Sequence, residues 1–347
     1  RTGIKHVLEA FDKYEEQFDN KSFITFKSLN NDFYEALRYL MKKVENALKE
    51  NPKYPRKIEV LDSYFAIMGF TKIYEYYNDA YLTNIEKIGD DISITIQCLD
   101  ASKFLLDIIK NKSYGTVFFS ATMYPLDYYK ELLTQNEGET LKIQSPFDHQ
   151  RLKLIMLDSI STRYQDRGQS IQGVVDTITS VVNEKRGNYI VFFPSYQYLN
   201  QVLENIPLDI NADILVQKRD MDFALRDLIL EKFKTQIDKT QIAFFVMGGM
   251  FAEGIDYIGD MLNGVIVVGV GLPMLNEINN QLNDYYQSHF KKGFDYAYRN
   301  PGMNKVIQAV GRVIRTQNDY GIAILIDDRF SHQAYRKLYP LEWKAYQ

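Results

Sequence analysis

Residues 308–315 read QAVGRVIR, and residues 321–326 read GIAILI. The first stretch favours a helix, and the second is typical of a buried strand. On such a helix Arg312 and Arg315 lie three residues apart on one face, with Gln308 one turn earlier. Arginine stays charged at any ordinary pH and offers a planar fork to phosphate oxygens. The pattern therefore predicts a rigid element that presents two fixed cations to a polyphosphate.

Short apolar segments alternate with helical patterns from residue 151 onward. Continuous apolar strands separated by helices indicate a parallel sheet that is covered on both faces, an α/β fold. In such sheets the functional residues lie in loops at the carboxyl ends of the strands. The predicted strands are 152–157, 189–193, 213–217, 242–246, 265–268 and 322–326, and the main predicted helices are 170–185, 196–205, 222–236 and 303–315.

The first 150 residues have a different pattern. Residues 4–18, 29–48 and 59 to about 86 show helical periodicity, so we predict an all-helical bundle over residues 1–90. Residues 92–119 then predict a strand, a short helix and a second strand, a βαβ unit. We therefore predict three parts: a helical region over 1–90, the end of one α/β domain over 91–150, and a second α/β domain over 151–347.

The composition limits the class of protein. An apolar fraction of 46% supports a folded core, and a net charge of −4 gives no bulk attraction to nucleic acid, although a local basic groove remains compatible with it. The single Cys98 excludes a disulfide framework and a cysteine metal cluster within the chain. No apolar run approaches the roughly 20 residues of a membrane helix, and no secretory signal is present. The simplest prediction is a soluble, cytoplasmic protein.

Small polar segments follow three of the predicted strands. They are Ser120-Ala121-Thr122, Pro194-Ser195-Tyr196 and, beyond strand 242–246, Glu253-Gly254-Ile255-Asp256. Segments of this kind leave backbone N–H groups available to a phosphate. Taken singly, each is more typical of an ordinary helix cap or turn, and an isolated arginine pair is more typical of a solvated helix face.

In this order and spacing, the segments resemble the C-terminal motor half of the XPD/DinG family of superfamily 2 helicases. The resemblance covers about residues 92–340 and is most specific at 249–257 and 308–321, where Asp319-Tyr320-Gly321 follows the arginines. Residues 191–196 and Pro146-Phe147 add support.

The resemblance implies a RecA-like fold and an ATP-dependent DNA helicase of 5′-to-3′ polarity, acting on single-stranded or forked DNA in repair or recombination. ATP and Mg²⁺ would be its cofactors, and residues 1–90 would be an arch-like insertion. The resemblance also implies a role for each motif. The residues that reach the ATP γ-phosphate across an interdomain cleft would be Gln308, Arg312 and Arg315, and those that link the nucleotide to the nucleic acid would be Glu253, Gly254 and Asp256. Hydrolysis would be coupled to strand movement by Ser120 and Thr122, and the strand backbone would be contacted by Ser195 and Tyr196.

The chain also departs from the family pattern. It has no Gly-Lys pair, hence no P-loop, and no Asp-Glu pair, hence no acidic metal-binding box. Cys98 alone cannot supply the four cysteines that hold an iron–sulfur cluster in many family members. The resemblance therefore implies the C-terminal portion of a larger helicase whose N-terminal motor region is missing, and a chain that alone does not hydrolyse ATP at a meaningful rate. Met250 and Phe251 stand where members commonly have a small or basic residue, which argues against a phosphate contact there.

Three alternatives remain open at this point. The first is an RNA helicase of the same superfamily, and the second is a non-catalytic nucleic-acid or protein-binding module. The third, an unrelated nucleotide-binding α/β enzyme, is disfavoured because no G-x-G-x-x-G opens the first βα turn. Residues 285–292 place tyrosines beside lysines, as a strand-stacking surface does, but lysines that merely cover rings are the commoner arrangement.

Overall fold

The computed structural model describes residues 2–51, 53, 56–234, 239–251, 257, 259–343 and 345–346. The chain divides into two compact units. The first unit comprises residues 1–114 and 132–135, and the second comprises residues 115–131 and 136–347. None of the helices in the described ranges is long and apolar enough to cross a membrane.

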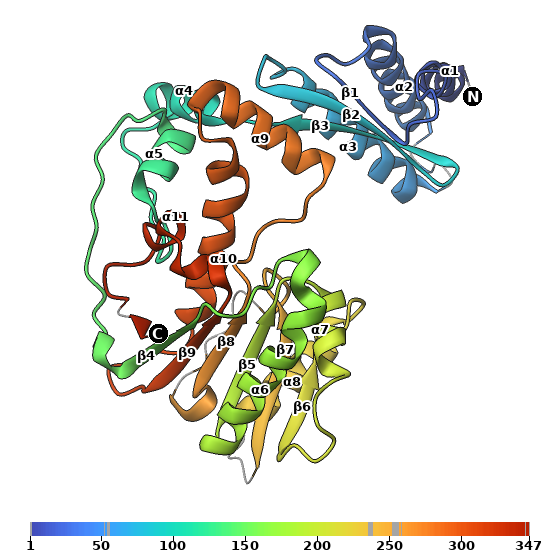
Figure 1. Ribbon diagram of the computed structural model, residues 1–347. Coiled ribbons are helices and arrows are strands. Elements are labelled where there is room, and N and C mark those ends of the chain that lie inside the picture. Colours follow the sequence, from blue (N-terminus) through green and yellow to red (C-terminus); the bar gives the residue numbers. More distant parts are fainter. Residues whose placement is uncertain are drawn as a thin grey trace. The chain divides into compact units, whose positions relative to one another are not determined.

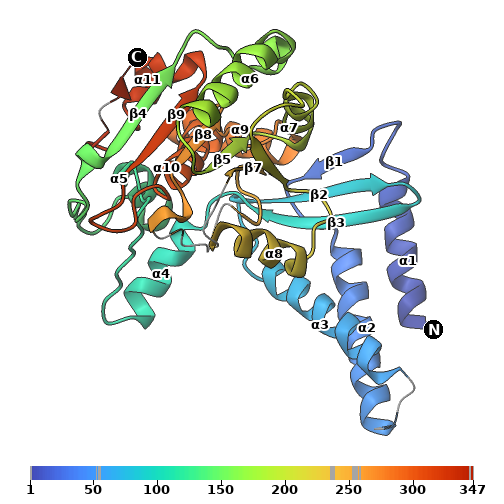
Figure 2. The same cartoon turned by 90° about the horizontal axis from the view of Figure 1, so that it is seen from below.

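The first unit combines helices with a small antiparallel sheet (Figure 2). The strands pair in the order β1-β2-β3, and β2 and β3 form a hairpin closed by Gly89 and Asp90. Tyr14, Phe33 and Ile85 are among the buried side chains where the helices meet the sheet. The elements are α1 (Thr2–Glu15), β1 (Phe23–Phe26), α2 (Asn31–Glu50), α3 (Lys57–Tyr74), β2 (Tyr81–Ile88), β3 (Asp91–Cys98) and α4 (Ser102–Lys112).

This unit corrects the prediction of an all-helical bundle over residues 1–90. The helices are present, but α3 ends at Tyr74 and residues 81–88 are a strand. The helical pattern was extended too far because aromatic residues continue past Tyr74, whereas the β-branched Thr83, Ile85 and Ile88 and the tight turn at Gly89 favour a hairpin. The domain boundaries predicted at residues 90 and 150 also differ from the division into units, since β3 and α4 belong to the first unit.

The second unit is built on a parallel sheet (Figure 1). Among the described residues its strands lie in the order β10-β4-β9-β8-β5-β7-β6. All six strands that the sequence predicts from residue 151 onward are present: β4 (Leu152–Leu157), β5 (Asn188–Phe193), β6 (Ala212–Val216), β7 (Thr240–Val246), β8 (Gly264–Val268) and β9 (Gly321–Ile326); β10 (Ala345–Tyr346) adds an edge.

Helices cover both faces of this sheet, as predicted for a RecA-like domain. One face packs against α6 (Arg167–Glu184) and α7 (Tyr196–Leu203). The other packs against α8 (Phe223–Lys234), α10 (Asn300–Val310) and α11 (Gln333–Arg336). The remaining elements are α5 (Leu126–Thr134), α9 (Glu277–Phe290), a π-helical turn (Asp295–Arg299), and 3-10 turns at His149–Arg151, Tyr164–Asp166, Gly259–Met261 and Asp328–Ser331.

The predicted βαβ unit over residues 92–119 is wrong. Residues 91–98 pair antiparallel with β2, and α4 follows as predicted, but the described residues 116–119 form no strand. Val117 and Phe119 are 82% and 89% exposed. The apolar run has the composition of a buried strand, but no described strand of either unit pairs with it.

Candidate functional site

The loops that carry the predicted motifs meet at one edge of the second unit. Because the strands are parallel, the segments that follow β5, β6 and β7 emerge at the same carboxyl edge. Ser195 follows β5, Gln217 follows β6, and Gly248 follows β7. Gly248 has a φ of 75°, a left-handed conformation that favours glycine and lets the chain turn sharply after the strand.

Ser195 and Tyr196 lie at the start of α7 and have defined partners. The Ser195 hydroxyl accepts the amide of Tyr198 at 3.3 Å, which makes Ser195 the helix N-cap. The hydroxyl of Tyr196 accepts the side-chain amide of the buried Gln217 at 2.8 Å, and Gln217 in turn accepts the amide of Val246 at 2.9 Å. This network ties the ends of three strands together, so the Tyr196 ring has a fixed position.

An arginine lies over the Tyr196 ring. The guanidinium carbon of Arg219 is 5.6 Å from the ring centroid. Arg219 is exposed and Tyr196 is partly exposed. A cation beside an accessible ring is the combination that contacts a nucleic-acid phosphate and stacks on a base. Sequence inspection did not single out Gln217 or Arg219, because their importance follows from their positions beside Tyr196.

The Ser120-Ala121-Thr122 loop packs against α10. Asn304, with its amide oriented to satisfy both ends, donates to the carbonyl oxygens of Tyr124 at 2.8 Å and Thr122 at 3.3 Å, and accepts the hydroxyl of Tyr129 at 2.5 Å. One turn later, Gln308 donates to the Thr122 hydroxyl at 3.5 Å. The structure therefore brings together Thr122 and Gln308, two predicted site residues that are far apart in the sequence.

Helix α10 ends earlier than predicted, at Val310. Arg312 and Arg315 consequently lie in the turn after the helix and not on one helical face. The cause is local: the carboxylate of Asp319 accepts the amides of Arg315 and Thr316, each at 2.7 Å, so these amides do not bond to helix carbonyls. Asp319 is thus a structural anchor for the turn that carries Arg315.

The Asp319 carboxylate is stabilised in its charged form. Burial raises the pKa of Asp319, but hydrogen bonds from the Thr316 hydroxyl and from backbone amides outweigh burial and hold the pKa below its usual value. The turn then packs tightly on β9, since a Cβ added to Gly321 would lie 2.1 Å from Val313. A side chain at residue 321 would push the arginine turn off the sheet.

The two arginines differ in exposure. Arg312 is only 4% exposed, whereas Arg315 is partly exposed. Arg312 lies near Tyr257: burial raises the pKa of Tyr257 to about 12, and the charges of Arg312 and Arg226 act in the opposite direction. Arg226 also donates to the carbonyl of Met250 at 3.2 Å. Arg312 therefore belongs to the interior beside the segment after β7, and Arg315 is the more accessible cation.

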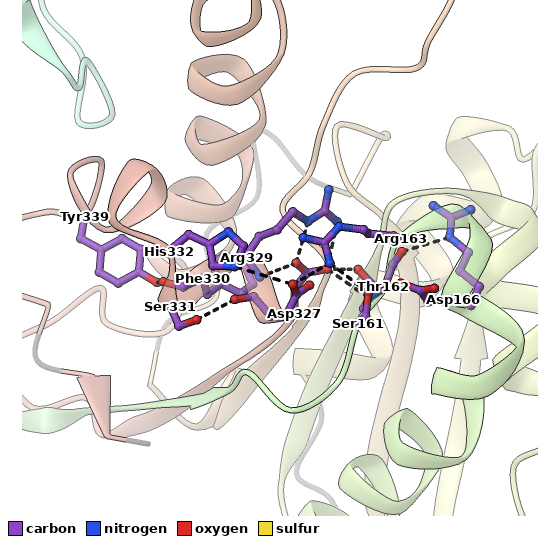
Figure 3. A network of polar contacts seen from close by, with 12 residues as sticks. Ser161, Thr162, Arg163, Asp166, Asp327, Arg329, Phe330, Ser331, His332 and Tyr339 are labelled. Atoms are coloured by element: carbon purple, nitrogen blue, oxygen red, sulfur yellow. Dashed lines mark hydrogen bonds and ion pairs between the residues drawn. The ribbon is translucent and has the colours of Figure 1, made fainter.

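A buried ionic network lies at the carboxyl ends of β4 and β9 (Figure 3). Asp327 is fully buried and accepts Arg329 at 2.7 and 2.9 Å, the amides of Arg329 and Thr162 at 2.9 and 3.2 Å, and the Thr162 hydroxyl. Beside it, Arg163 donates to Asp328 at 2.6 Å. The network joins the loop after β4 to the loop after β9, two segments that the sequence alone does not connect.

Other predicted residues take different positions. Glu253, Gly254 and Asp256 lie outside the described residues. Phe251 is fully buried and stacks on Phe245 with ring centroids 4.0 Å apart, so its side chain belongs to the core. Within residues 285–292, Tyr286 is buried and Lys292 pairs with Glu131 at 3.2 Å. These contacts support the structural interpretation of that segment.

Comparison with known proteins agrees with this geometry. Residues 178–346 match the family model described as helicase C-terminal domain. The chain is 26% identical over 309 residues to the ATP-dependent DNA helicase DinG of Photobacterium profundum, covering 84% of the chain and 43% of that protein. It is 25% identical over 277 residues to the ATP-dependent DNA helicase CHL1 of Meyerozyma guilliermondii, covering 71% of the chain and 33% of that protein.

The chain is therefore similar to the C-terminal domain of DinG- and CHL1-type helicases. Solved structures support the fold. The structure of S. tokodaii Xpd4 aligns with a TM-score of 0.62 at 15% identity, covering 99% of the chain and 66% of that structure. An XPD helicase aligns with a TM-score of 0.59 at 17% identity, covering 96% of the chain and 60% of that structure. The chain spans 43% or less of the curated relatives described above.

The resemblance implies two kinds of cofactor, and the residues present fit one better than the other. Cys98 is the single cysteine of the sequence and lies on β3, so these residues cannot hold an iron–sulfur cluster, which needs four thiolates or their equivalents. A nucleotide phosphate fits better, because Arg315 is accessible and its turn is fixed by Asp319.

Proposed function

We propose that this chain is the C-terminal motor portion of an ATP-dependent DNA helicase that moves 5′-to-3′ along single-stranded DNA. The observation that carries the proposal is the position of Gln308 on α10: it contacts Thr122 on one side and leads into the arginine turn on the other. One rigid helix thereby connects a coupling loop to a cation suited to a phosphate.

Arg315 and Gln308 act on the nucleotide in this proposal. When bound, ATP·Mg²⁺ supplies a γ-phosphoryl group whose oxygens carry growing charge during transfer. Arg315 stabilises that charge, and Gln308 also reaches the γ-phosphate. The buried Arg312 supports the turn from the interior. Glu253, Gly254 and Asp256 are proposed to link the nucleotide to the nucleic acid, by resemblance to the family motif.

Ser195 and Tyr196 contact the DNA strand in this proposal. The N-terminus of α7 offers backbone N–H groups to a phosphate, and Tyr196 with Arg219 offers a ring and a cation. Ser120 and Thr122 transmit movement between the nucleotide and the strand, because their loop is bonded to α10 through Asn304 and Gln308.

A companion lobe completes the motor. The 347 residues contain neither a P-loop nor an Asp-Glu box, and the chain spans a minor part of its relatives. We therefore propose that a P-loop-bearing lobe of the same polypeptide binds most of the nucleotide. The form that contains both parts is called the two-lobe protein below.

The proposal is tested by comparing the isolated chain with the two-lobe protein. We expect the isolated chain to bind single-stranded DNA and to hydrolyse ATP at the background rate, and the two-lobe protein to hydrolyse ATP with stimulation by single-stranded DNA. Stimulation by RNA but not DNA would indicate an RNA helicase. DNA binding with no hydrolysis in the two-lobe protein would indicate a non-catalytic module.

Replacing Tyr196 by alanine tests the strand contact. One lost base-stacking interaction costs about 1–3 kcal/mol, so the affinity for a dT oligonucleotide should fall about 5- to 150-fold in fluorescence anisotropy. Tyr320 provides a matched control, because it is exposed and Arg151 lies 4.3 Å from its ring centroid, but it precedes β9 at the amino edge of the sheet. Equal losses of DNA affinity for Tyr196→Ala and Tyr320→Ala would show that Tyr196 is not the strand contact.

A further inference from the structure

Lys305 is a cation at the carboxyl edge of the parallel sheet. It lies on α10, one turn before Gln308, beside Phe192, Met247 and Gly248 at the ends of β5 and β7. Throughout the part of the chain that the structure describes, no hydrogen bond or ion pair involves its ammonium group. The other lysine treated above, Lys292, is by contrast paired with Glu131.

The position of Lys305 is unfavourable for a purely structural lysine. The side chain is partly buried and its stem passes over Gly248, where an added Cβ would lie 3.4 Å from Cε and 3.7 Å from Nζ. Burial lowers the pKa of Lys305, and no charge among the described residues opposes this effect. Burying an ammonium group without a partner costs free energy, so such a group is expected where it meets a ligand.

The chemistry of the ligand follows from the surroundings. A single ammonium with three donors binds one phosphate oxygen as a point charge. Gln308, assigned to the nucleotide, lies beside the same residues, and Phe192 among them precedes Ser195, assigned to the strand, by three residues. Both of these ligands present phosphate oxygens.

We propose that Lys305 binds a phosphate oxygen at the carboxyl edge of the sheet, beside Gln308 and Gly248. The assignment of this oxygen to the DNA backbone or to the nucleotide rests on the function proposed above. The phosphate site itself does not depend on that function, and the two claims can be tested separately.

Chemical protection tests the site directly. Lysines are reductively methylated and quantified by peptide mass spectrometry, in the presence of a dT oligonucleotide, ATP·Mg²⁺ or tripolyphosphate, with the two-lobe protein used for the ATP arm. Protection of Lys305 by the oligonucleotide alone assigns a backbone phosphate, and protection by ATP alone assigns the nucleotide. Protection by tripolyphosphate alone supports the phosphate site and contradicts the proposed helicase function. Unchanged methylation with all three probes overturns the inference.

Replacing Lys305 by methionine separates binding from packing. Methionine keeps the apolar stem and removes the charge, so we expect no fall in the midpoint of thermal unfolding. DNA-stimulated ATP hydrolysis by the two-lobe protein should fall about 10- to 100-fold, the size expected for one hydrogen bond to a charged group. If the oxygen belongs to DNA, the salt dependence of strand binding should also weaken, by about 0.7 in the log–log slope.

Lys153 provides the matched control. It is exposed on β4 near the amino end of the strand, at the edge of the sheet opposite to the site. Lys153→Met should leave hydrolysis and the salt dependence unchanged, and Lys305→Arg should retain more activity than Lys305→Met. Wild-type hydrolysis by Lys305→Met in an otherwise active two-lobe protein would show that the side chain only fills space.

Discussion

Arg315→Ala is expected to lower ATP hydrolysis by the two-lobe protein about 10³-fold or more, the loss that follows removal of an arginine finger. The variant should fold normally, because the turn is held through the backbone amide of Arg315, which bonds to Asp319 whatever the side chain. The measurement is the steady-state rate of phosphate release with single-stranded DNA at saturation, together with a thermal unfolding curve for each variant.

Two control variants make this test specific. Arg336→Ala removes an exposed arginine from α11 of the same unit and should leave the rate within a few-fold of the wild type. Arg312→Ala should behave differently again: its side chain is buried, so its loss should lower the free energy of unfolding as well as the rate. If Arg315→Ala keeps a near-wild-type rate, Arg315 is not the finger.

Asp327→Ala is expected to lower the free energy of unfolding of the second unit by about 3–5 kcal/mol, the usual result of breaking a buried ion pair. The reason is the guanidinium of Arg329, whose side chain is 16% exposed and which would lose its only acidic partner within 4 Å among the described residues. The measurement is urea denaturation with linear extrapolation. A loss of this size is a large part of the stability of a typical domain.

The neighbouring aspartate gives the comparison. Asp328 pairs with Arg163, but their side chains are 26% and 37% exposed, so Asp328→Ala should cost about 1 kcal/mol or less. In the double variant Asp327→Ala, Arg329→Met the unpaired charge is gone, so part of the stability should return. Equal losses for Asp327→Ala and Asp328→Ala would contradict the central role of the buried carboxylate.

The contribution of Asp327 also depends on pH. Burial raises the pKa of Asp327, but the hydrogen bonds and charge of Arg329 and the bonds from Thr162 outweigh burial and lower the pKa below its usual value. A depressed folded-state pKa stabilises the protein above the unfolded-state pKa of about 3.9. The difference in unfolding free energy between wild type and Asp327→Ala should therefore be constant above about pH 5 and shrink as the pH falls through the folded-state value.

The parallel sheet was predictable because its signal is local. Runs such as 189–193 and 322–326 are apolar over their whole length, which is typical of a strand buried on both faces. Ser195 and Gln308 were predicted from residue type and spacing, and they lie at the start of α7 and on α10, where parallel strands and their following helices place them.

The predictions failed where competing local signals were close in strength. Aromatic residues continue the helical pattern past Tyr74, but the hairpin turn at Gly89 fixes residues 81–98 as paired strands. In the same way, the helical pattern at residue 315 is broken by Asp319, whose carboxylate captures the amides of Arg315 and Thr316. Residues 116–119 were misassigned because composition does not reveal whether a partner strand is available.

The sequence by itself determined the parallel sheet and its strand positions, since these depend on residue type and short-range spacing. Only the tertiary structure decided which groups meet: that Thr122 contacts Gln308, that Arg312 is interior while Arg315 is accessible, and that Lys305 has no hydrogen-bond or ion-pair partner among the described residues. The physical reason is that burial and pairing depend on contacts between segments far apart in the chain, and side chains of the same type differ in free energy according to what surrounds them.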